Sequence, residues 1–179
     1  MNSSSTIIAS SGVFQIEYLK EAQDKDFEGL MRVSKSLEKN YGSRSVLTKN
    51  TITKYFNHHE SIPFIARYRE DIIGYIIGIP LEALAQEPWV RTEENYGKKN
   101  TIYTYAFVIK EDFRKNGYAK MLKKVFLSRT EKLNQIEYVT GHVIKGISEN
   151  FTGNIEIINK VENWQGTGKQ FEYYRRKLD

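Results

Sequence analysis

The stretch Thr101–Arg129, TIYTYAFVIKEDFRKNGYAKMLKKVFLSR, decides the fold because it joins a strand to a helix through a glycine turn. Its first nine residues are uncharged and mostly β-branched or aromatic, which is typical of a strand buried on both faces. Its last fifteen residues are rich in lysine, and their apolar positions recur at helical spacing. These positions are Ala119, Leu122, Val125 and Phe126.

The turn between these two elements, residues 114–119 (RKNGYA), is expected to bind an anion. The first backbone N–H groups of a helix have no partner within the helix, and the helix dipole adds about half a positive charge there. Gly117 and the small Ala119 allow a ligand to approach the backbone closely. The stretch therefore predicts a binding site for a pyrophosphate.

The length of 179 residues predicts one domain with an ordinary core over residues 12–179, preceded by a loose tail over residues 1–11. The chain has no cysteine, which excludes disulfides, thiolate metal sites and a cysteine nucleophile. No apolar run reaches the length of a membrane span and the N-terminus does not resemble a signal peptide, so we expect a cytoplasmic protein without a membrane partner. The net charge of +5 (27 basic minus 22 acidic residues) favours anionic ligands without choosing among them.

The hydrophobic pattern of the remaining chain predicts the element order β-α-α-β-β-β-α-β-α-β. Outside the opening stretch, strands are expected over Val13–Leu19, Ile62–Tyr68, Ile72–Ile79, Ile136–Val143 and Gln170–Leu178. Helices are expected over Lys20–Tyr41, over about Asn50–Asn57 with Asn50 or Thr51 as the N-cap, and over Ser148–Glu162. Residues 81–100 form a long connection, and its Trp89 is a candidate cover for a substrate or a packing residue.

The opening stretch resembles motif A of the GNAT superfamily of amine N-acetyltransferases, whose signature is Arg/Gln-x-x-Gly-x-Gly/Ala. The signature stands here as Arg114-Lys-Asn-Gly117-Tyr-Ala119, directly after an apolar strand and at the start of a helix. The order of elements is similar along nearly the whole chain, and Phe171–Arg175 resembles the closing strand of these proteins. The resemblance implies an α/β (α+β) GNAT fold, with a mixed central sheet of about six to seven strands flanked by about four helices.

The resemblance also implies that acetyl-CoA is the cosubstrate. In the family the pantetheine arm lies along the end of the central strand, where this chain has Phe107, Val108 and Ile109. The turn amides would hold the pyrophosphate, and lysines would offset its charge. Asn150 is a candidate for binding the arm or for capping the last helix. The remaining expected cofactor-binding residues are Arg114, Lys115, Asn116, Gly117, Tyr118, Ala119 and Lys120.

The reaction implied by the resemblance is direct attack of a primary amine on the thioester, and the amine could belong to a small molecule, an amino acid or a protein. Where some family members carry a catalytic glutamate on the central strand, this chain has Tyr103. Where many carry a tyrosine in the last helix, it has Asn159. The catalytic candidates are therefore Tyr103 and Tyr105, which share a strand face with Phe107. Weaker substitutes are Glu82 and Glu87 as bases and Tyr173 and Tyr174 as acids.

Two other functions remain as alternatives. The departures from the family's catalytic residues allow a catalytically silent domain that binds acyl-CoA as a sensor or scaffold. A nucleic-acid binder would use the net charge and Arg175–Lys177, but no base-stacking motif accompanies these residues, so we expect no nucleic-acid partner. A homodimer is left open.

His58-His59-Glu60 contains three potential metal ligands in a row. Adjacent histidines are expected to point in different directions, and no third ligand has a usable spacing. We therefore expect no metal site.

Overall fold

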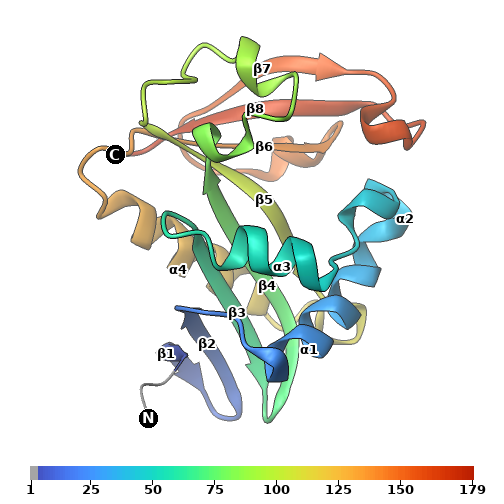
Figure 1. Ribbon diagram of the computed structural model, residues 1–179, viewed down its shortest axis with the longest axis vertical. Helices are drawn as coiled ribbons and strands as arrows, with labels where there is room; N and C mark the ends of the chain where they lie inside the picture. The colour runs from blue at the N-terminus through green and yellow to red at the C-terminus, as the bar shows by residue number, and fades with distance from the viewer. Residues whose placement is uncertain (1–3) are drawn as a thin grey trace. The chain divides into compact units, whose positions relative to one another are not determined.

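The computed structural model describes residues 4–179 and shows an α/β protein whose eight strands form a mixed sheet (Figure 1). The strands are β1 (Ser5–Ser11), β2 (Phe14–Leu19), β3 (Ile62–Tyr68), β4 (Asp71–Pro80), β5 (Thr101–Ile109), β6 (Tyr138–Ile144), β7 (Ile155–Val161) and β8 (Phe171–Lys177). The α-helices are α1 (Asp24–Ser34), the single turn α2 (Glu38–Tyr41), α3 (Lys49–Phe56) and α4 (Tyr118–Glu131). Between residues 4 and 179, no helix has the length and apolar character needed to cross a membrane.

The chain forms two compact units, and β4 and β5 contribute to both of them. The first unit consists of the residues up to Ile77 together with Ala106–Ser128. The second unit consists of Gly78–Tyr105 and Arg129–Asp179. The prediction that residues 12–179 form a single domain stays a prediction.

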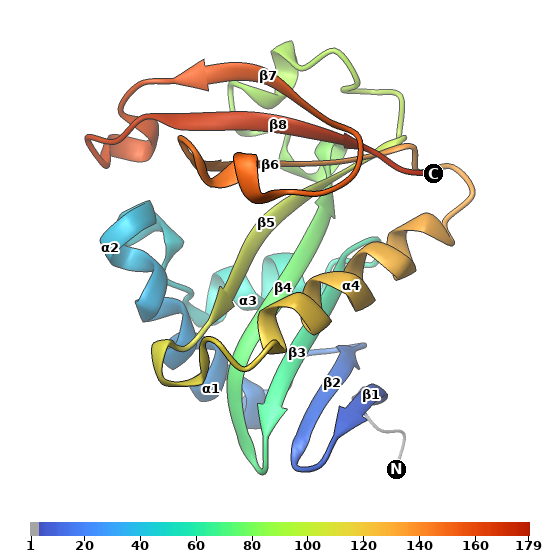
Figure 2. The same ribbon diagram turned by 180° about the vertical axis from the view of Figure 1, so that it is seen from behind.

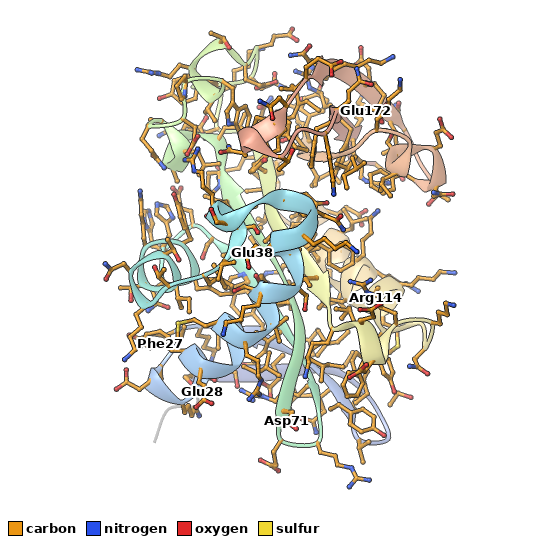
Figure 3. All side chains as sticks on the ribbon, turned by 90° about the vertical axis from the view of Figure 1, so that its right-hand side faces the viewer. Phe27, Glu28, Glu38, Asp71, Arg114 and Glu172 are labelled. Carbon is orange, nitrogen blue, oxygen red and sulfur yellow. The ribbon has the colours of Figure 1, made fainter. Side chains whose placement is uncertain are left out.

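In the first unit the strand order is β1-β2-β3-β4, followed by the end of β5. The pairs β1/β2 and β2/β3 are antiparallel. Helices α1 and α3 lie on one face of these strands and α4 lies on the opposite face (Figures 1 and 2). At the tip of the β3–β4 hairpin, Asp71 forms an exposed ion pair with Arg32 of α1, 3.7 Å apart (Figure 3).

Gly74 explains how closely β4 and β5 approach each other in the first unit. A Cβ atom added at Gly74 would lie 2.5 Å from the carbonyl oxygen of Val108 and 2.4 Å from the side chain of Ile109. The neighbouring amide of Lys110 donates a 2.8 Å hydrogen bond to the carbonyl of Ile73. Gly74 therefore serves the packing of the strand that carries the turn.

In the second unit the strand order is β5-β6-β8-β7. The pairs β6/β8 and β7/β8 are antiparallel, whereas β5 and β6 are parallel. The parallel pairing is short, because it runs from Thr101↔Tyr138 to Tyr103↔Thr140 and ends there. Strand β5 continues to Ile109, so its edge beyond Tyr103 has no partner in β6 among the described residues.

The predicted fold class is confirmed, and the strands expected over residues 13–19, 62–68, 72–79, 101–109, 136–143 and 170–178 are present with shifts of a few residues. The loose tail is wrong where the structure describes it, because Ser5–Ser11 pairs with β2 as strand β1. Three of the eleven residues predicted as tail lie outside the described part of the chain. Pairing with an adjacent strand orders a short segment whose own composition is weak.

The last helix expected over Ser148–Glu162 is wrong. The chain instead forms a 3₁₀ turn over Ile147–Asn150 and strand β7 over Ile155–Val161. The apolar residues of this segment fit helical spacing by coincidence, whereas its β-branched side chains favour a strand and find a partner in β8. Gly153, with φ of 93°, separates the turn from the strand. Asn159 consequently lies on a strand, so the comparison with the family's helical tyrosine does not apply.

Helix α3 begins one residue earlier than expected, and its N-cap is Thr48 rather than Asn50 or Thr51. The Thr48 hydroxyl accepts a 3.2 Å hydrogen bond from the amide of Thr51, and the Thr51 hydroxyl accepts a 2.8 Å hydrogen bond from the amide of Thr48. This reciprocal arrangement satisfies two amides that the helix leaves without partners.

Candidate active site

The turn between β5 and α4 has the backbone shape of an anion-binding site. Lys115 and Gly117 both adopt left-handed conformations, with φ of 65° and 77°. Arg114, which precedes them, is extended, with φ of −71° and ψ of 162°. Left-handed residues in a turn can direct successive amides toward one point. A Cβ atom added at Gly117 would meet nothing within 4 Å, and the residues from Arg114 to Gly117 are exposed. The open side of the turn is therefore accessible to a ligand.

Most amides of this turn are not used by the backbone. The Arg114 amide donates to the carbonyl of Glu111 at 3.1 Å, and the next amide along the chain to donate a backbone hydrogen bond is that of Met121, which donates to the carbonyl of Gly117 at 3.0 Å. Within residues 4–179, the amides of residues 115–120 donate no hydrogen bond to a backbone carbonyl. These donors lie at the N-terminus of α4, where the helix dipole also favours negative charge.

The side chains around the turn mostly support its shape. The Arg114 guanidinium, labelled in Figure 3, donates a 3.3 Å hydrogen bond to the carbonyl of Ile109. The Asn116 amide donates to the carbonyls of Phe113 and Arg114, each at 3.3 Å. The Tyr118 ring stacks on Phe14 of β2, with ring centroids 4.0 Å apart. Of the predicted phosphate-binding side chains, Lys115 and Lys120 are exposed and Ala119 adds no bulk.

The three residues predicted to line the pantetheine arm stand at the end of β5. Val108 and Ile109 are buried, and Phe107 is half-buried. The carbonyl of Ile109 already accepts a hydrogen bond from Arg114. A ligand at this end of β5 would therefore contact the backbone of the strand and not its side chains.

The second unit contains a hydrogen-bonded pair that the sequence pattern does not identify. The hydroxyl of Tyr103 on β5 lies 2.9 Å from Nδ1 of His142 on β6, and both residues are buried. The His142 ring stacks on Trp164, with centroids 3.7 Å apart and an angle of 14° between the rings. Trp89 and Tyr173 also contact it, at centroid distances of 4.8 Å each.

Burial controls the protonation of these groups. Desolvation lowers the pKa of His142 from 6.5 to about 3, so the imidazole is neutral near pH 7. Desolvation likewise raises the pKa of the Tyr173 and Tyr174 phenols, which therefore stay protonated. A neutral imidazole next to a phenol can accept a hydrogen bond from the phenolic O–H at Nδ1.

The other candidates have structural partners or stand elsewhere. The Glu82 carboxylate accepts hydrogen bonds from the amides of Gly97 and Lys99, at 3.1 and 2.9 Å, and so holds residues 81–100 together. Tyr105 is half-buried on β5. Asn150 is exposed at the end of a 3₁₀ turn, so its expected position at the start of a helix is wrong.

The geometry of His58 and His59 also differs from the expectation. Their rings stack, with centroids 4.7 Å apart, instead of pointing in different directions. Ligand atoms of His58, His59 and Glu60 lie within 4.8 Å of one another, and the two last residues are exposed. Nδ1 of His58 accepts a 3.2 Å hydrogen bond from the Glu60 amide.

The fold, the parallel strand pair that separates early and the turn before α4 define a class of acyl-transferring proteins. The model of the acetyltransferase (GNAT) family matches residues 19–145 of this chain. The protein belongs to the GNAT family, and the family resemblance predicted from the sequence is confirmed. No curated protein matches the chain by sequence.

Solved structures share the fold at low sequence identity. Arabidopsis thaliana NAA60 in complex with a bisubstrate analogue has a TM-score of 0.67 and 12% identity, covering 93% of this chain and 98% of that chain. The ribosomal-protein-alanine N-acetyltransferase from Brucella melitensis has a TM-score of 0.64 and 11% identity, covering 91% and 99%. A spermidine N-acetyltransferase SpeG chimera from Vibrio cholerae and hSSAT has a TM-score of 0.61 and 12% identity, covering 91% and 95%.

Proposed function

We propose that the protein is an acetyl-CoA-dependent N-acetyltransferase, in which a primary amine attacks the thioester directly. The observation that carries the proposal is the turn before α4, whose left-handed Lys115 and Gly117 leave a row of amides without backbone partners. Family membership supports acetyl transfer, and Arabidopsis NAA60, which shares the fold, has been solved in complex with acetyl-CoA.

The turn fits the pyrophosphate of such a cosubstrate. Its donors are backbone amides, so their positions are fixed before the ligand binds. The space beside Gly117 is open, and a side chain there would occupy the place of the phosphates. Bound acetyl-CoA supplies the activated acetyl group, and backbone N–H groups near the end of β5 would polarise its carbonyl. Donors aimed at a developing oxyanion lower the barrier by several kcal/mol.

The Tyr103–His142 pair supplies the acid–base chemistry in this proposal. A primary amine whose ammonium form has a pKa near 10.4 is mostly protonated at pH 7. Removal of that proton costs about 4.6 kcal/mol. In the tautomer that this proposal requires, the Tyr103 hydroxyl donates to Nδ1 of His142, and the phenolic oxygen would meet the amine or a water. As the amine attacks, its proton would move to Tyr103 while the Tyr103 proton moves toward Nδ1 of His142. Because burial lowers the pKa of His142 to about 3, the imidazole would not retain this proton, which would leave to water.

An amine acceptor is consistent with the names of proteins that share the fold. One is named for acetylating the alanine of a ribosomal protein and another for acetylating spermidine. We propose an acceptor of this broad class, a primary amine on a protein or a small molecule. A cytoplasmic location and a homodimer stay predictions.

The function is tested by following thiol release from acetyl-CoA in the presence of a panel of amines. The panel contains a peptide with an N-terminal alanine, spermidine and free amino acids. We expect amine-dependent release of thiol with at least one acceptor, and loss of that release in Tyr103→Phe. Release that no amine accelerates, together with saturable binding of acetyl-CoA, would contradict the transferase proposal.

That second outcome would favour a catalytically silent domain that binds acyl-CoA. One observation supports this alternative. The segment that should carry the family's catalytic tyrosine on a helix forms a 3₁₀ turn and a strand instead, and no α-helix follows α4 in the described part of the chain. The buried Tyr103–His142 pair favours the transferase, because a purely binding domain has no use for a proton path.

A further inference from the structure

Residues 81–100 connect β4 to β5 and are held in place by their own polar contacts, although they contain only two short 3₁₀ turns. Connections of this length usually have a function of their own. The Glu82 carboxylate binds the amides of Gly97 and Lys99. The Glu93 carboxylate accepts a 2.8 Å hydrogen bond from the amide of Asn95, and the Asn95 side chain accepts one from Lys98. The segment therefore has a defined conformation.

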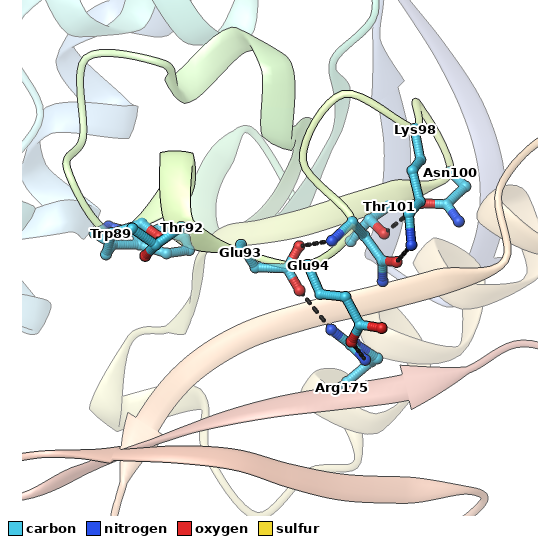
Figure 4. A network of polar contacts seen from close by, with 9 residues as sticks. Trp89, Thr92, Glu93, Glu94, Lys98, Asn100, Thr101 and Arg175 are labelled. Atoms are coloured by element: carbon cyan, nitrogen blue, oxygen red, sulfur yellow. Dashed lines mark hydrogen bonds and ion pairs between the residues drawn. The ribbon is translucent and has the colours of Figure 1, made fainter.

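Arg175 of β8 ties this segment to the sheet of the second unit (Figure 4). Its guanidinium donates to Glu93 at 2.5 Å and to Glu94 at 3.2 Å. The side chains of Arg175 and Glu93 are only 10% and 4% exposed, whereas that of Glu94 is 73% exposed. Removal of one partner from a buried ion pair leaves an uncompensated buried charge and costs far more than removal of one partner from an exposed pair, so the contact with Glu93 is the important one.

Trp89 stands four residues before Glu93 and contacts the catalytic pair proposed above. Its ring centroid is 4.9 Å from that of Tyr103 and 4.8 Å from that of His142, which it meets edge-on. It also contacts Tyr173 at 5.5 Å and Trp164 at 6.0 Å. Trp89, which belongs to the connection between β4 and β5, thus covers the Tyr103–His142 pair, whose two members come from β5 and β6.

We propose that Trp89 is a positioning residue for the Tyr103–His142 pair, and that Arg175, through Glu93, holds residues 81–100 where Trp89 covers the imidazole. The part of this inference that concerns catalysis rests on the proposed function. Its structural content, the dependence of the His142 environment on Trp89 and Arg175, is separate and can be measured without turnover.

The physical effect of Trp89 is to exclude water from one side of the imidazole. His142 stacks on Trp164, and its other neighbours include Trp89, Tyr103 and Tyr173. Burial raises the pKa of the Tyr173 phenol, and the charges nearest to Tyr173 are the mutually paired Arg175 and Glu93. With Trp89 removed, water would reach the ring and the protonated imidazole would become easier to form.

The chain has only two tryptophans, Trp89 and Trp164, and both contact His142. A protonated imidazole in contact with an indole quenches its fluorescence, so an acid titration of tryptophan fluorescence reports the protonation of His142. In Trp89→Leu the remaining reporter is Trp164, which stacks directly on His142. We expect the midpoint of the quenching transition to rise by about one pH unit or more relative to the wild type.

Arg175→Gln is the second variant, and we expect it to raise the same midpoint because residues 81–100 lose their tie to β8. Arg175→Lys keeps one charged contact with Glu93 and should return the midpoint toward the wild-type value. Arg32→Gln is the matched control, since Arg32 also pairs with two carboxylates, Glu28 and Asp71, but is exposed and belongs to the first unit. It should leave the midpoint unchanged. If Trp89→Leu does not fold, as judged by circular dichroism, the Arg175 series is decisive.

The outcomes separate this inference from the proposed function. Unchanged quenching midpoints in folded Trp89→Leu and Arg175→Gln would overturn the positioning role, whatever the activity. Shifted midpoints in a protein that acetylates no amine would support the positioning role and contradict the transferase. In an active enzyme, the acid limb of the profile of kcat/KM against pH should move in the same direction as the fluorescence midpoint.

Discussion

The two candidate sites, the turn of the first unit and the Tyr103–His142 pair of the second unit, are built in different ways. The pyrophosphate turn of the first unit is contiguous in sequence, and its donors are backbone amides between Lys115 and Lys120. The acid–base pair of the second unit joins Tyr103 and His142, which are 39 residues apart and meet through their side chains. A site built from one contiguous stretch of backbone can be recognised from a local sequence motif. A side-chain pair that is brought together by strand pairing cannot.

The same contrast predicts different responses to mutation. The turn should be sensitive to bulk and charge at one glycine and tolerant of changes in the side chains around it. The pair should be sensitive to the loss of either polar atom, with no effect on the binding of acetyl-CoA.

Gly117→Glu should lower the affinity for acetyl-CoA by at least about 100-fold, because it places a side chain and a negative charge where the phosphates bind. The left-handed conformation of Gly117, with φ of 77°, adds a cost of about 1–2 kcal/mol to folding. Isothermal titration calorimetry measures the affinity, and thermal unfolding measures the stability.

Gly12→Glu is the matched control. Gly12 belongs to the same unit, has φ of 61° and has no atom within 4 Å of an added Cβ. It should show a similar loss of stability with unchanged affinity for acetyl-CoA. Equal affinity losses in the two variants would mean that strain, and not the turn, controls binding.

His142→Gln and Tyr103→Phe should each lower kcat by about 10²–10³-fold while leaving the affinity for acetyl-CoA unchanged. Tyr103→Phe removes the hydroxyl of the 2.9 Å contact, and His142→Gln replaces the imidazole by an amide that cannot take up a proton; both keep the approximate size of the side chain. Because the two residues act as one path, the double variant should be little slower than either single variant. Multiplication of the two losses in the double variant would contradict a shared path. His59→Gln, at an exposed position in the first unit, should retain full kcat.

Much of the fold could be predicted because local composition and tertiary context agree. Thr101–Ile109 is a strand by composition and occupies the sheet. Ser148–Glu162 shows the opposite case, since helical spacing and β-branched composition compete there and pairing with β8 selects the strand. Ser5–Ser11 becomes ordered only because β2 lies next to it. In both segments where the predicted secondary structure is wrong, pairing with another strand decides the structure. That strand is β8 for Ser148–Glu162 and β2 for Ser5–Ser11.

The two candidate sites show the same difference between a local sequence signal and a tertiary one. Gly117 is identifiable because a glycine between an apolar strand and a helix has few structural alternatives. Tyr103 could be placed on the central strand, but its partner His142 could not, because the register of β5 against β6 is a property of the folded sheet. One signal was available: an isolated histidine within an apolar strand needs a buried hydrogen-bond partner.

The lowered pKa of His142 predicts a pH dependence of stability. The folded-state pKa of about 3 lies below the unfolded value of 6.5, so between these values the unfolded chain binds a proton that the native protein does not. Stability is therefore fully present above pH 6.5 and is lost as pH falls. His142 alone should reduce the free energy of unfolding by about 2 kcal/mol between about pH 7.5 and about pH 5. Urea unfolding of wild type and His142→Gln measures the difference, and parallel curves for the two proteins would contradict the buried neutral imidazole.

The smallest predicted effect concerns the charges beside the turn. Lys120 is exposed in the first turn of α4, so its contribution to phosphate binding is a screened interaction through solvent. Lys120→Gln should weaken acetyl-CoA binding only about two- to threefold at low salt, and the difference should disappear as the ionic strength rises. Lys124→Gln removes the same charge one turn further along α4 and should have a smaller effect, because the field of the helix N-terminus falls off within the first turn. A large, salt-independent loss in Lys120→Gln would mean that side chains rather than backbone amides hold the pyrophosphate. The contrast between the turn and the Tyr103–His142 pair would then disappear, since both would depend on specific side-chain atoms.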